Sequence, residues 1–582
     1  MRNQSRLDTQ RIDEIQKACE TRPFIGTEAE TIIIHGKPLD AGDPASCLQI
    51  LHKIGKEYPT TAIKKEMIES LGERGKTIAN ATSPDVPQTI IESHPEPFHS
   101  PAAAAAAERL MAIINDMMCQ RLSQEHGLDI HLLAGAAWRP PHLTENDVSP
   151  AVGAYKQAYY RYQIGKHGDK VGAAAGSHLN LSAPWAGNNG PDRISREMIR
   201  MTGLLRLIAV PLSIALSAAS PMYYGSNGGK KEPQYMTKLT PFESARLGHV
   251  WPGRTIMDTS ELFRDLASFR KTLGQWAKNG TLLTGRDIWL PVRAQAGHSD
   301  KGKSFEEISN ELNIPFDEER IPYAQKLITS SFKFGLHDDG NPYFNDKQWK
   351  QIEKWRQKKL KNIIAADRNR VELRVLEAPP AFPDMTPFEY LKSIYTFIEL
   401  LFIYLSEEPQ FVGDLQYGEN ELAAAKSNET AVLEHGLDAE LLWIPGNMKK
   451  VSARKLLAEI MRRIENLAQG LGCNKDLDVI RKILNDELLP PAARIRKEIA
   501  EWYNINVKHR HNSRFLPDDS YPLSLLARNR EAMKDELAQI IKVIPSLHPN
   551  DKKRIEELVK AIEQLNTENN GTKTRSLWRR RL

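Results

Sequence analysis

Three strand-like stretches of this chain each carry two polar side chains separated by one residue. They occur in FIGTEAETIII, AAAGSHLNLSAP and RVELRVLEA. Because side chains alternate across a β-strand, residues i and i+2 point to the same face. Each stretch therefore predicts a strand with one polar face. The three pairs are Glu28 and Glu30, His178 and Asn180, and Glu372 and Arg374.

The third stretch shows the division between the two faces most clearly. Val371, Leu373 and Val375 would pack against a core, whereas Glu372 and Arg374 would face a cavity. Taken singly, each stretch also fits an exposed edge strand with one solvated polar face. Taken together, carboxylates joined by an imidazole and a guanidinium predict the floor of a site that holds metal ions and an anionic group.

The acidic residues in and near these stretches indicate divalent cations. An isolated carboxylate buried in an apolar strand would become neutral, because burial disfavours the charged form. Bound Mg²⁺ resolves this conflict, since it prefers oxygen ligands and is commonly shared with nucleotide phosphates. Arg374 would then face the phosphate. The carboxylates in question are Glu28, Glu30, Asp85, Glu92 and Glu372.

Composition excludes wholesale disorder and membrane residence. Hydrophobic residues make up 41% and charged residues 26% of the 582 residues, which is typical of a globular protein. The longest apolar stretch, Leu204 to Ser220, contains Arg206 and Pro211 and predicts a buried helix. The first residues are too polar for a signal peptide, so we expect a cytoplasmic protein.

The chain is predicted to hold a mixed catalytic body followed by a helical region. We place the catalytic body at residues 1–445, with an insertion at about 299–361, and the helical region at residues 446–582. Ser100 and Pro101 predict the start of an alanine-rich helix, as its N-cap and its first helical residue. Ser452 is likewise expected to cap a helix whose apolar residues follow helical spacing.

The last residues, 573–582, form a basic tail around Trp578. Such a cluster can contact nucleic acid, acidic lipid or an acidic protein surface, but a solvated chain end explains it as well. The net charge of the whole chain is only +5. We therefore expect no membrane partner and no nucleic-acid partner, with a contact through the basic tail left open. The oligomeric state, a homodimer included, is also left open.

The order of several motifs along the chain carries a family resemblance. No single motif is specific, but the set occurs in the order of one family. The motifs are GTEAE, PDVPQTIIES, GSHLNLS, ALSAASPMYYG followed by SAR, VELRVLEAPP, and SNETAVLEHGLDAEL. The chain resembles the glutamate-cysteine ligase family, within the wider glutamine synthetase superfamily of carboxylate-amine ligases. The resemblance covers about Phe24 to Leu441, without the insertion.

This resemblance implies an α+β fold with a curved, mostly antiparallel sheet and helices behind it. It also implies an ATP-dependent reaction with Mg²⁺ or Mn²⁺. A carboxylate, typically the side chain of glutamate, would be phosphorylated and then attacked by an amine to form an amide. The implied partners are a small-molecule carboxylate and amine. The implied metal ligands are Glu28, Glu30, Asp85, Glu92, His178 and Glu372.

The resemblance also implies roles for residues that contact the nucleotide or the substrate. Arg374, beside Glu372, would hold the transferred phosphoryl group as a catalytic residue. A guanidinium can grip a carboxylate or phosphate in bidentate fashion, so Arg246 and Arg293 are candidates for either, although each also fits a surface ion pair. The further candidates for binding ATP or substrate are Asn180, Ser244 and Asn428.

Some residues depart from the family pattern. Ala29 stands between the first two glutamates, where the family often has a third acidic residue, and Glu377 stands where Asp is usual. Ala431 and Glu434 replace basic residues that several relatives carry near Asn428. The metal and phosphate residues are nevertheless present. The amine is therefore left undetermined, and cysteine is one candidate.

Two other classes of function fit the same residues. A phosphotransferase of the same superfamily would transfer the phosphoryl group to a nitrogen without forming an amide. A binding or regulatory protein would keep the fold and lose turnover. A binding or regulatory protein of this kind is expected to have lost a metal-binding carboxylate, and none is lost in this sequence.

Overall fold

An antiparallel β-sheet forms the centre of the fold. The structure, a computed structural model, describes residues 8–21, 23–36, 48–84, 89–134, 137–138, 175–181, 191–226, 235–250, 325–328, 332–336, 370–408, 418–443, 449–505 and 514–579. The strands of the sheet are β1 Ile25–Gly36, β2 Leu48–Ile50, β3 Thr82–Pro84, β4 Ile90–Ser93, β5 Asp129–Ala134, β7 Ser177–Leu181, β10 Gln325–Ile328, β11 Phe332–Leu336 and β12 Arg370–Leu376.

The strands follow the order β10-β11-β12-β7-β1-β4-β3, and β2 and β5 also pair with β1. Each of these described pairs is antiparallel. The α+β class and the antiparallel pairing agree with the sequence-based expectation, whereas the curvature of the sheet stays a prediction. β10 and β11 fall inside the expected insertion at 299–361, so this stretch contributes two strands to the sheet.

The two faces of the sheet contact different parts of the protein. On one face, Ile33 and Leu179 belong to the main hydrophobic core. On the other face, Ile32 and Ile34 pack with Ile90 in a small separate cluster. From Ile32 to Ile34 β1 has apolar residues on both faces, and the charged pair lies in its first half.

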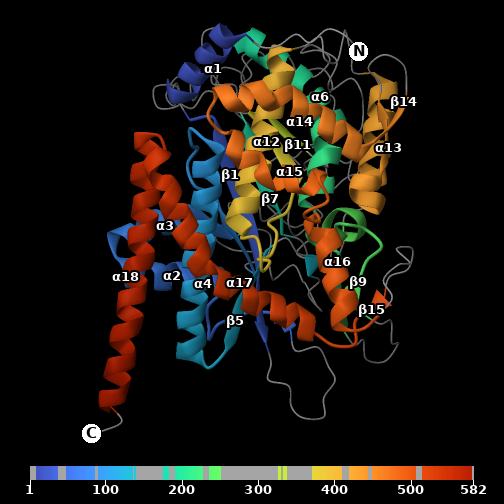
Figure 1. The fold of residues 1–582 in the computed structure, drawn as a ribbon. Coiled ribbons are helices and arrows are strands. Elements are labelled where there is room, and N and C mark those ends of the chain that lie inside the picture. The colour runs from blue at the N-terminus through green and yellow to red at the C-terminus, as the bar shows by residue number, and fades with distance from the viewer. Residues whose placement is uncertain are drawn as a thin grey trace, which may run out of the picture.

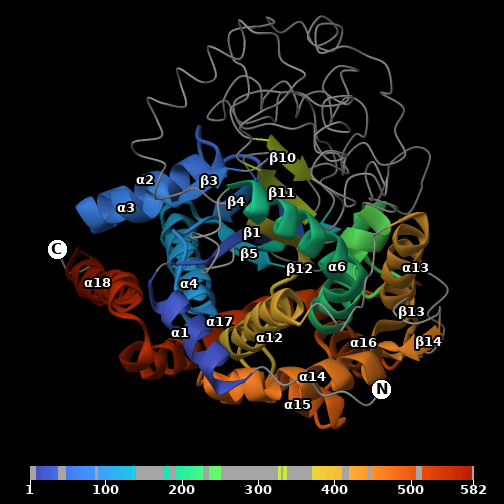
Figure 2. The same ribbon diagram turned by 90° about the horizontal axis from the view of Figure 1, so that it is seen from above.

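Three helices lie behind the apolar face of the sheet. They are α4 Pro101–His126, α6 Pro191–Ser217 and α12 Pro387–Glu407. α4 packs on β1 and β5, α6 packs on β11 and β12, and α12 lies between α4 and α6 (Figure 2). As predicted, the Ser100 side chain accepts a hydrogen bond from the Ala103 N–H, and Pro101 is the first residue of α4. At α12, Thr386 and Glu389 form a capping box.

The apolar stretch from Leu204 is a buried helix, as predicted, and its charged residue has a partner inside the protein. Arg206 is 1% exposed, and its guanidinium lies 3.7 Å from the Glu429 carboxylate. Pro211 lies within α6 and does not end it. No helix in the described part of the chain is long and apolar enough to cross a membrane.

The carboxyl-terminal helices complete the same hydrophobic core. They are α13 Glu419–His435, α14 Ala453–Gly470, α15 Asp478–Leu484, α16 Pro491–Trp502, α17 Ser520–Val543 and α18 Pro549–Arg579. α14, α15 and α17 pack on α12, α16 packs on α6, and α18 runs beside α4 (Figure 1). Ser452 caps α14 as predicted. One core cluster extends from Ile12 to Leu565, so the helices beyond residue 446 are packed into the body.

Smaller elements surround this core. Among the described residues, β13 pairs with β14, and a second small sheet has the order β15-β9-β8-β6. The remaining elements are α1 Thr9–Thr21, α2 Pro59–Leu71, α3 Glu73–Asn80, β6 Ala137–Trp138, β8 Met222–Ser226, β9 Tyr235–Leu239, η4 Arg246–Val250, η6 Gly436–Asp438, β13 Glu440–Trp443, β14 Lys449–Ser452, η7 Asn474–Leu477, β15 Arg514–Phe515 and η8 Ile544–Ser546. The basic tail is helical as far as Arg579, the last residue of α18.

A buried ion pair joins α17 to α4 and α12, two of the three helices behind the sheet. The Arg109 guanidinium of α4 donates to both carboxylate oxygens of Glu536, at 2.8 and 3.2 Å. Glu536 also accepts the backbone N–H of Phe388, in the first turn of α12, at 2.7 Å. Both charged side chains are buried, so each needs the other to offset the loss of hydration.

Glu399 is a buried carboxyl on α12 whose charge is disfavoured. Burial, together with the nearby Asp476 carboxylate, raises the pKa of Glu399 from 4.5 to about 8. Between pH 4.5 and pH 8 the folded protein therefore holds a proton that the unfolded chain releases. The free energy of unfolding then falls as the pH rises through this interval, and this contribution is constant above it.

Glu399→Gln is expected to remove this pH dependence. In the wild type this group lowers the free energy of unfolding by about 1.4 kcal/mol per pH unit. The variant lacks this slope, so its free energy of unfolding should rise relative to that of the wild type between pH 5 and pH 8. Urea unfolding of both proteins at several pH values measures this difference. Glu465→Gln, on the exposed side of α14, is the matched control and should keep the wild-type slope. Equal slopes for wild type and Glu399→Gln would show that Glu399 is charged in the folded state.

Candidate functional site

The register of the sheet brings the three predicted polar pairs together. Glu28 of β1 lies directly opposite His178 of β7. Asn180, two residues further along β7, lies opposite Glu372 of β12. On the other side of β1, Glu30 lies opposite Glu92 of β4. Since directly opposed residues share a face, these residues gather on one face of four adjacent strands.

His178 lies between the two glutamates of β1. Its Nδ1 is 3.5 Å from Glu28 Oε2, and its Nε2 is 3.6 Å from Glu30 Oε1. The Asn180 amide donates to Glu28 Oε1 at 3.4 Å. His178 is 1% exposed and Glu30 is 8% exposed. The centre of the candidate site is therefore a buried imidazole with a carboxylate at each of its two nitrogens.

The carboxylates of Glu30 and Glu92 are oriented by hydrogen bonds from neighbouring segments. Glu30 Oε2 accepts the backbone N–H of Gly176 at 2.9 Å, and the Glu30 N–H donates to the Gly176 carbonyl. Ser83 of β3 donates to Glu92 Oε2 at 3.2 Å. These two donors were not predicted from the sequence. The donor in GSHLNLS is a backbone group, and Ser83 becomes a neighbour only through the pairing of β3 with β4.

A β-bulge in β12 shapes the part of the site that carries Arg374. Leu373 pairs with Leu179, but the next paired residue is Leu376, opposite Ser177, so β12 has one residue more than β7 in this interval. Strict alternation would have put Leu376 on the polar face. Instead Val375 and Leu376 are both buried in the main core. Arg374 is buried as well and lies within this interval, so its place on the face of Glu372 stays a prediction.

A hydrogen-bonded cluster behind the sheet holds β7 in place. The Ser177 hydroxyl contacts Tyr395 Oη of α12 at 2.6 Å and donates to the Glu108 carboxylate of α4. Burial raises the pKa of the Glu108 carboxyl and that of the Tyr395 hydroxyl. Because Ser177 precedes His178 and points to the opposite face, this cluster fixes the strand that presents His178.

Arg246 and Ser244 belong to a buried cluster around Glu377. Arg246 Nε and the Ser244 hydroxyl both donate to Glu377 Oε1, as does the Ser220 hydroxyl. The Ala219 N–H donates to the other oxygen at 2.6 Å. Glu377 is completely buried. Glu377 is thus the common acceptor of four donors from the chain after α6.

The remaining N–H groups of Arg246 hold the bulged strand. They donate to the Arg374 carbonyl at 3.1 Å and to the Leu376 carbonyl at 3.0 Å. A Cβ atom on Gly176 would lie 2.7 Å from Arg246 Nη1, so only glycine lets the guanidinium approach this closely. In this conformation Arg246 positions the backbone of Arg374. Its predicted contact with a substrate carboxylate or phosphate stays a prediction, as does that of Ser244.

Three other predicted residues lie apart from this cluster or beyond the described residues. Asn428 is buried between α13 and β13, where its amide donates to the Leu442 carbonyl and its amide oxygen accepts the Leu442 N–H. Both ends of the side chain are therefore used within the fold, and nucleotide binding by Asn428 stays a prediction. Asp85 and Arg293 lie outside the described residues, and so does the side chain of Glu372.

The side chains gathered at the site are of the types that bind divalent cations. Carboxylate oxygens are the ligands that Mg²⁺ prefers, and Mn²⁺ also accepts an imidazole nitrogen. The separations of 3.5 and 3.6 Å between His178 and the two carboxylates are longer than strong hydrogen bonds. Glu28 and Glu30 contact opposite nitrogens of the ring, so the arrangement offers donors on both sides of His178.

Comparison with known proteins places the chain in a family. The family model described as glutamate-cysteine ligase family 2 (GCS2) matches residues 58–501. The chain belongs to this family. Glu28 and Glu30 of this GCS2 protein precede the matched residues, and the sheet register joins them to His178 and Asn180 inside the match. The match also continues past residue 446, through α14 and α15 and into α16.

The fold of this GCS2 protein is that of a glutamate–cysteine ligase. The structure of the enzyme from Francisella tularensis in complex with AMP matches with a TM-score of 0.50 at 14% identity, over 94% of this chain and 99% of that chain. A bifunctional glutathione synthetase from Pasteurella multocida matches with a TM-score of 0.48 at 14% identity, over 91% of this chain and 55% of the other. The ligase PafA, solved with the ubiquitin-like protein Pup, matches with a TM-score of 0.37 at 10% identity, over 90% and 80%. No curated protein matches the chain. Family and fold together are those of carboxylate-amine ligases.

Proposed function

We propose that this protein is an ATP-dependent ligase that activates a carboxylate with the help of Mg²⁺ or Mn²⁺ and joins it to an amine. The side chain of glutamate is the proposed carboxylate. The observation that carries the proposal is the sheet register, which collects Glu28, Glu30, His178 and Asn180 on one face in a chain of glutamate-cysteine ligase family 2. The AMP bound to the ligase from Francisella tularensis supports the use of a nucleotide on this fold.

The residues of the site suit separate tasks in this reaction. Bound Mg²⁺ or Mn²⁺ would neutralise the phosphate charge of ATP. Glu28, Glu30 and His178 would hold the cations from the centre of the sheet, with Glu92 beside them on β4. Asp85 and Glu372 complete the proposed ligand set. The amide oxygen of Asn180 is buried and has no hydrogen-bond partner among the described residues, so it is available to a ligand.

Arg374 would bind the phosphoryl group as it moves. In the first step a carboxylate oxygen of the substrate attacks the γ-phosphorus of ATP, and ADP leaves. In the second step the amine nitrogen attacks the acyl carbon, phosphate leaves and the amine gives up a proton. Phosphoryl transfer depends mainly on positioning and charge neutralisation, which a guanidinium supplies. Arg246 supports this task by holding the Arg374 carbonyl.

The test is incubation with ATP, Mg²⁺, glutamate and a panel of amines that includes cysteine, with mass detection of the products. We expect phosphate release to require both glutamate and an amine, and an amide to form in equal amount. Arg374→Ala is expected to lose product formation and keep its fold. The matched control is Arg462→Ala on α14, whose side chain is 50% exposed and pairs with Glu459.

The outcome also separates the alternatives. A phosphorylated nitrogen compound without an amide would identify a phosphotransferase and overturn the ligase proposal. Nucleotide binding without any consumption of ATP across the whole panel would favour a binding protein. Full activity of Arg374→Ala would show that Arg374 does not take part in the reaction.

A further inference from the structure

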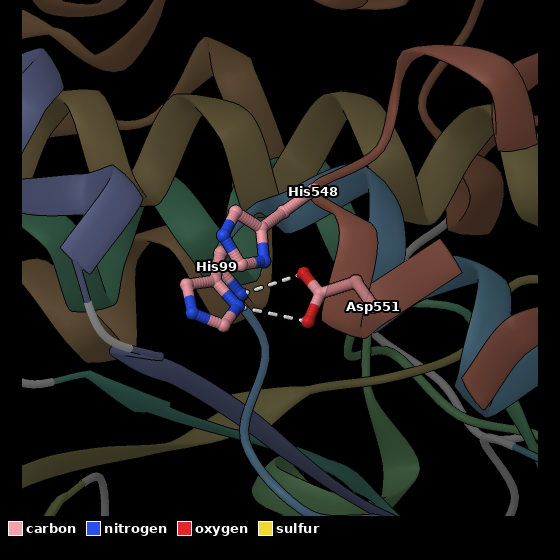
Figure 3. Close-up of side chains that lie close together, drawn as sticks. All are labelled: His99, His548 and Asp551. Atoms are coloured by element: carbon pink, nitrogen blue, oxygen red, sulfur yellow. Dashed lines mark hydrogen bonds and ion pairs between the residues drawn. The ribbon is translucent and has the colours of Figure 1, made fainter. Parts of the chain in front are cut away.

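A second group of metal-ligating side chains lies away from the sheet. His99 directly precedes Ser100, the N-cap of α4, whereas His548 and Asp551 lie at the start of α18. One ligand atom from each of the three residues lies within 4.8 Å of the others. Figure 3 shows the two imidazole rings face to face, with the Asp551 carboxylate beside them. Residues more than 440 positions apart in the sequence thus meet where α18 passes the start of α4.

Asp551 is the fixed centre of this group. Its side chain is completely buried, and the carboxylate accepts the His99 backbone N–H at 2.8 Å. Its other oxygen is 2.9 Å from His99 Nδ1. As an acidic residue in the first turn of α18, Asp551 is also stabilised by the positive end of the helix. The carboxylate is therefore held in one orientation before any ligand arrives.

His548 gives the group its second imidazole. Its ring is stacked on that of His99, with ring centroids 3.8 Å apart and 22° between the planes. The contact of the His548 ring with its own helix is long, 3.4 Å from the Asn550 N–H to Nδ1. A helix-capping role accounts for Asp551 and for the His99 backbone. His548, the residue before α18, also accepts the Asn550 N–H as a cap would, so capping leaves only the stacking of its ring on that of His99 unexplained.

The charges around the group are compatible with a cation. A basic group nearby is Arg554, whose Nη1 is 4.0 Å from Asp551 Oδ1. The Arg554 guanidinium is engaged elsewhere: it donates to the carbonyls of Glu96 and Pro97 and lies over the Phe98 ring. Burial lowers the pKa of Arg554. One carboxylate oxygen of Asp551 therefore contacts the His99 ring, and the other accepts the His99 backbone N–H.

We propose that His99, His548 and Asp551 form a Zn²⁺ site that fastens α18 to the segment before α4. Two imidazole nitrogens and one carboxylate oxygen are a frequent ligand set for Zn²⁺, with water in the fourth position. Tetrahedral ligand atoms lie roughly 3.3 Å apart. The three ligand atoms, which lie within 4.8 Å of one another, would have to draw closer, and the stacked rings would have to turn so that a nitrogen of each points at the ion.

The test is equilibrium dialysis of the full chain against Zn²⁺ with Mg²⁺ in excess, which occupies the carboxylates of the sheet. We expect one tightly bound Zn²⁺ in the wild type. His548→Gln is expected to bind it at least about 10-fold more weakly, because even outer partners of a metal site contribute that much. His548 is partly exposed, so the variant should fold, and circular dichroism checks this.

Two controls locate the ion. His126→Gln, at the opposite end of α4, should bind Zn²⁺ as the wild type does. His178→Gln should also keep the tight Zn²⁺. If His178→Gln loses it and His548→Gln keeps it, the ion belongs to the sheet site and the proposal fails. The proposal also fails if the wild type binds no Zn²⁺. As an independent readout, hydrogen exchange at the start of α18 should slow with Zn²⁺ in the wild type and be unchanged in His548→Gln.

Discussion

Glu28→Gln is expected to lose at least about 100-fold in ATP-dependent turnover and to need more Mg²⁺ for what remains. A metal ion contributes several kcal/mol of charge stabilisation in such a transition state, and about 1.4 kcal/mol corresponds to a factor of ten. Glutamine has the shape of glutamate and still accepts from Asn180, so the main change is the lost charge beside His178. Steady-state rates at increasing Mg²⁺ measure the effect, and Mn²⁺ titration measures cation binding without turnover.

The matched control for this variant is Glu57→Gln. Glu57 is an exposed glutamate that pairs with Lys65 at 3.2 Å, so the same chemical change should leave both rate and cation binding unaltered. Wild-type cation binding by Glu28→Gln would show that Glu28 is not a ligand. An unfolded Glu28→Gln protein would instead show that the pairing of Glu28 with His178 is structural.

Glu377→Ala is expected to lower the free energy of unfolding by about 3–5 kcal/mol, the usual cost of breaking a buried ion pair. The change leaves the buried Arg246 guanidinium without its carboxylate and removes the acceptor of the Ala219 N–H and the Ser244 hydroxyl. Because Arg246 also holds the carbonyl of Arg374, we expect the bulge of β12 to loosen as well. Urea unfolding measures the loss of stability.

Glu377→Asp is the matched variant for this prediction. It keeps the charge and shortens the side chain by one methylene. We expect Glu377→Asp to retain more stability than Glu377→Ala. A loss below about 1 kcal/mol in Glu377→Ala would mean that Arg246 finds another partner, since leaving a buried charge unpaired costs more than that.

Alternation along single strands was enough to predict the centre of the site. Glu28 and Glu30 share a face, as do His178 and Asn180, because a strand has a period of two residues. Helix starts at Ser100 and Ser452 were also predictable, since a cap depends on residues three positions apart. These features are local, so the sequence alone contains the information.

The contacts of Arg246 could not be predicted in this way. Its partners, Glu377 and the carbonyls of Arg374 and Leu376, lie about 130 residues away in the sequence and depend on a bulge that no residue type signals. The same holds for Asn428. Its residue type suits ligand binding, but its amide nitrogen and amide oxygen both form hydrogen bonds with the backbone of Leu442 on β13. Residue type indicates what a side chain can bind, whereas tertiary packing decides what it does bind.

The ion pair between Arg109 and Glu536 has a consequence for folding during synthesis. Arg109 and the Phe388 N–H, which lie behind the sheet, both depend on a carboxylate from α17. During synthesis, Glu536 leaves the ribosome after every strand of the main sheet and after α4 and α12. Until then, closing the core would bury Arg109 without its partner. The nascent chain is therefore expected to close this part of its core only after α17 has emerged.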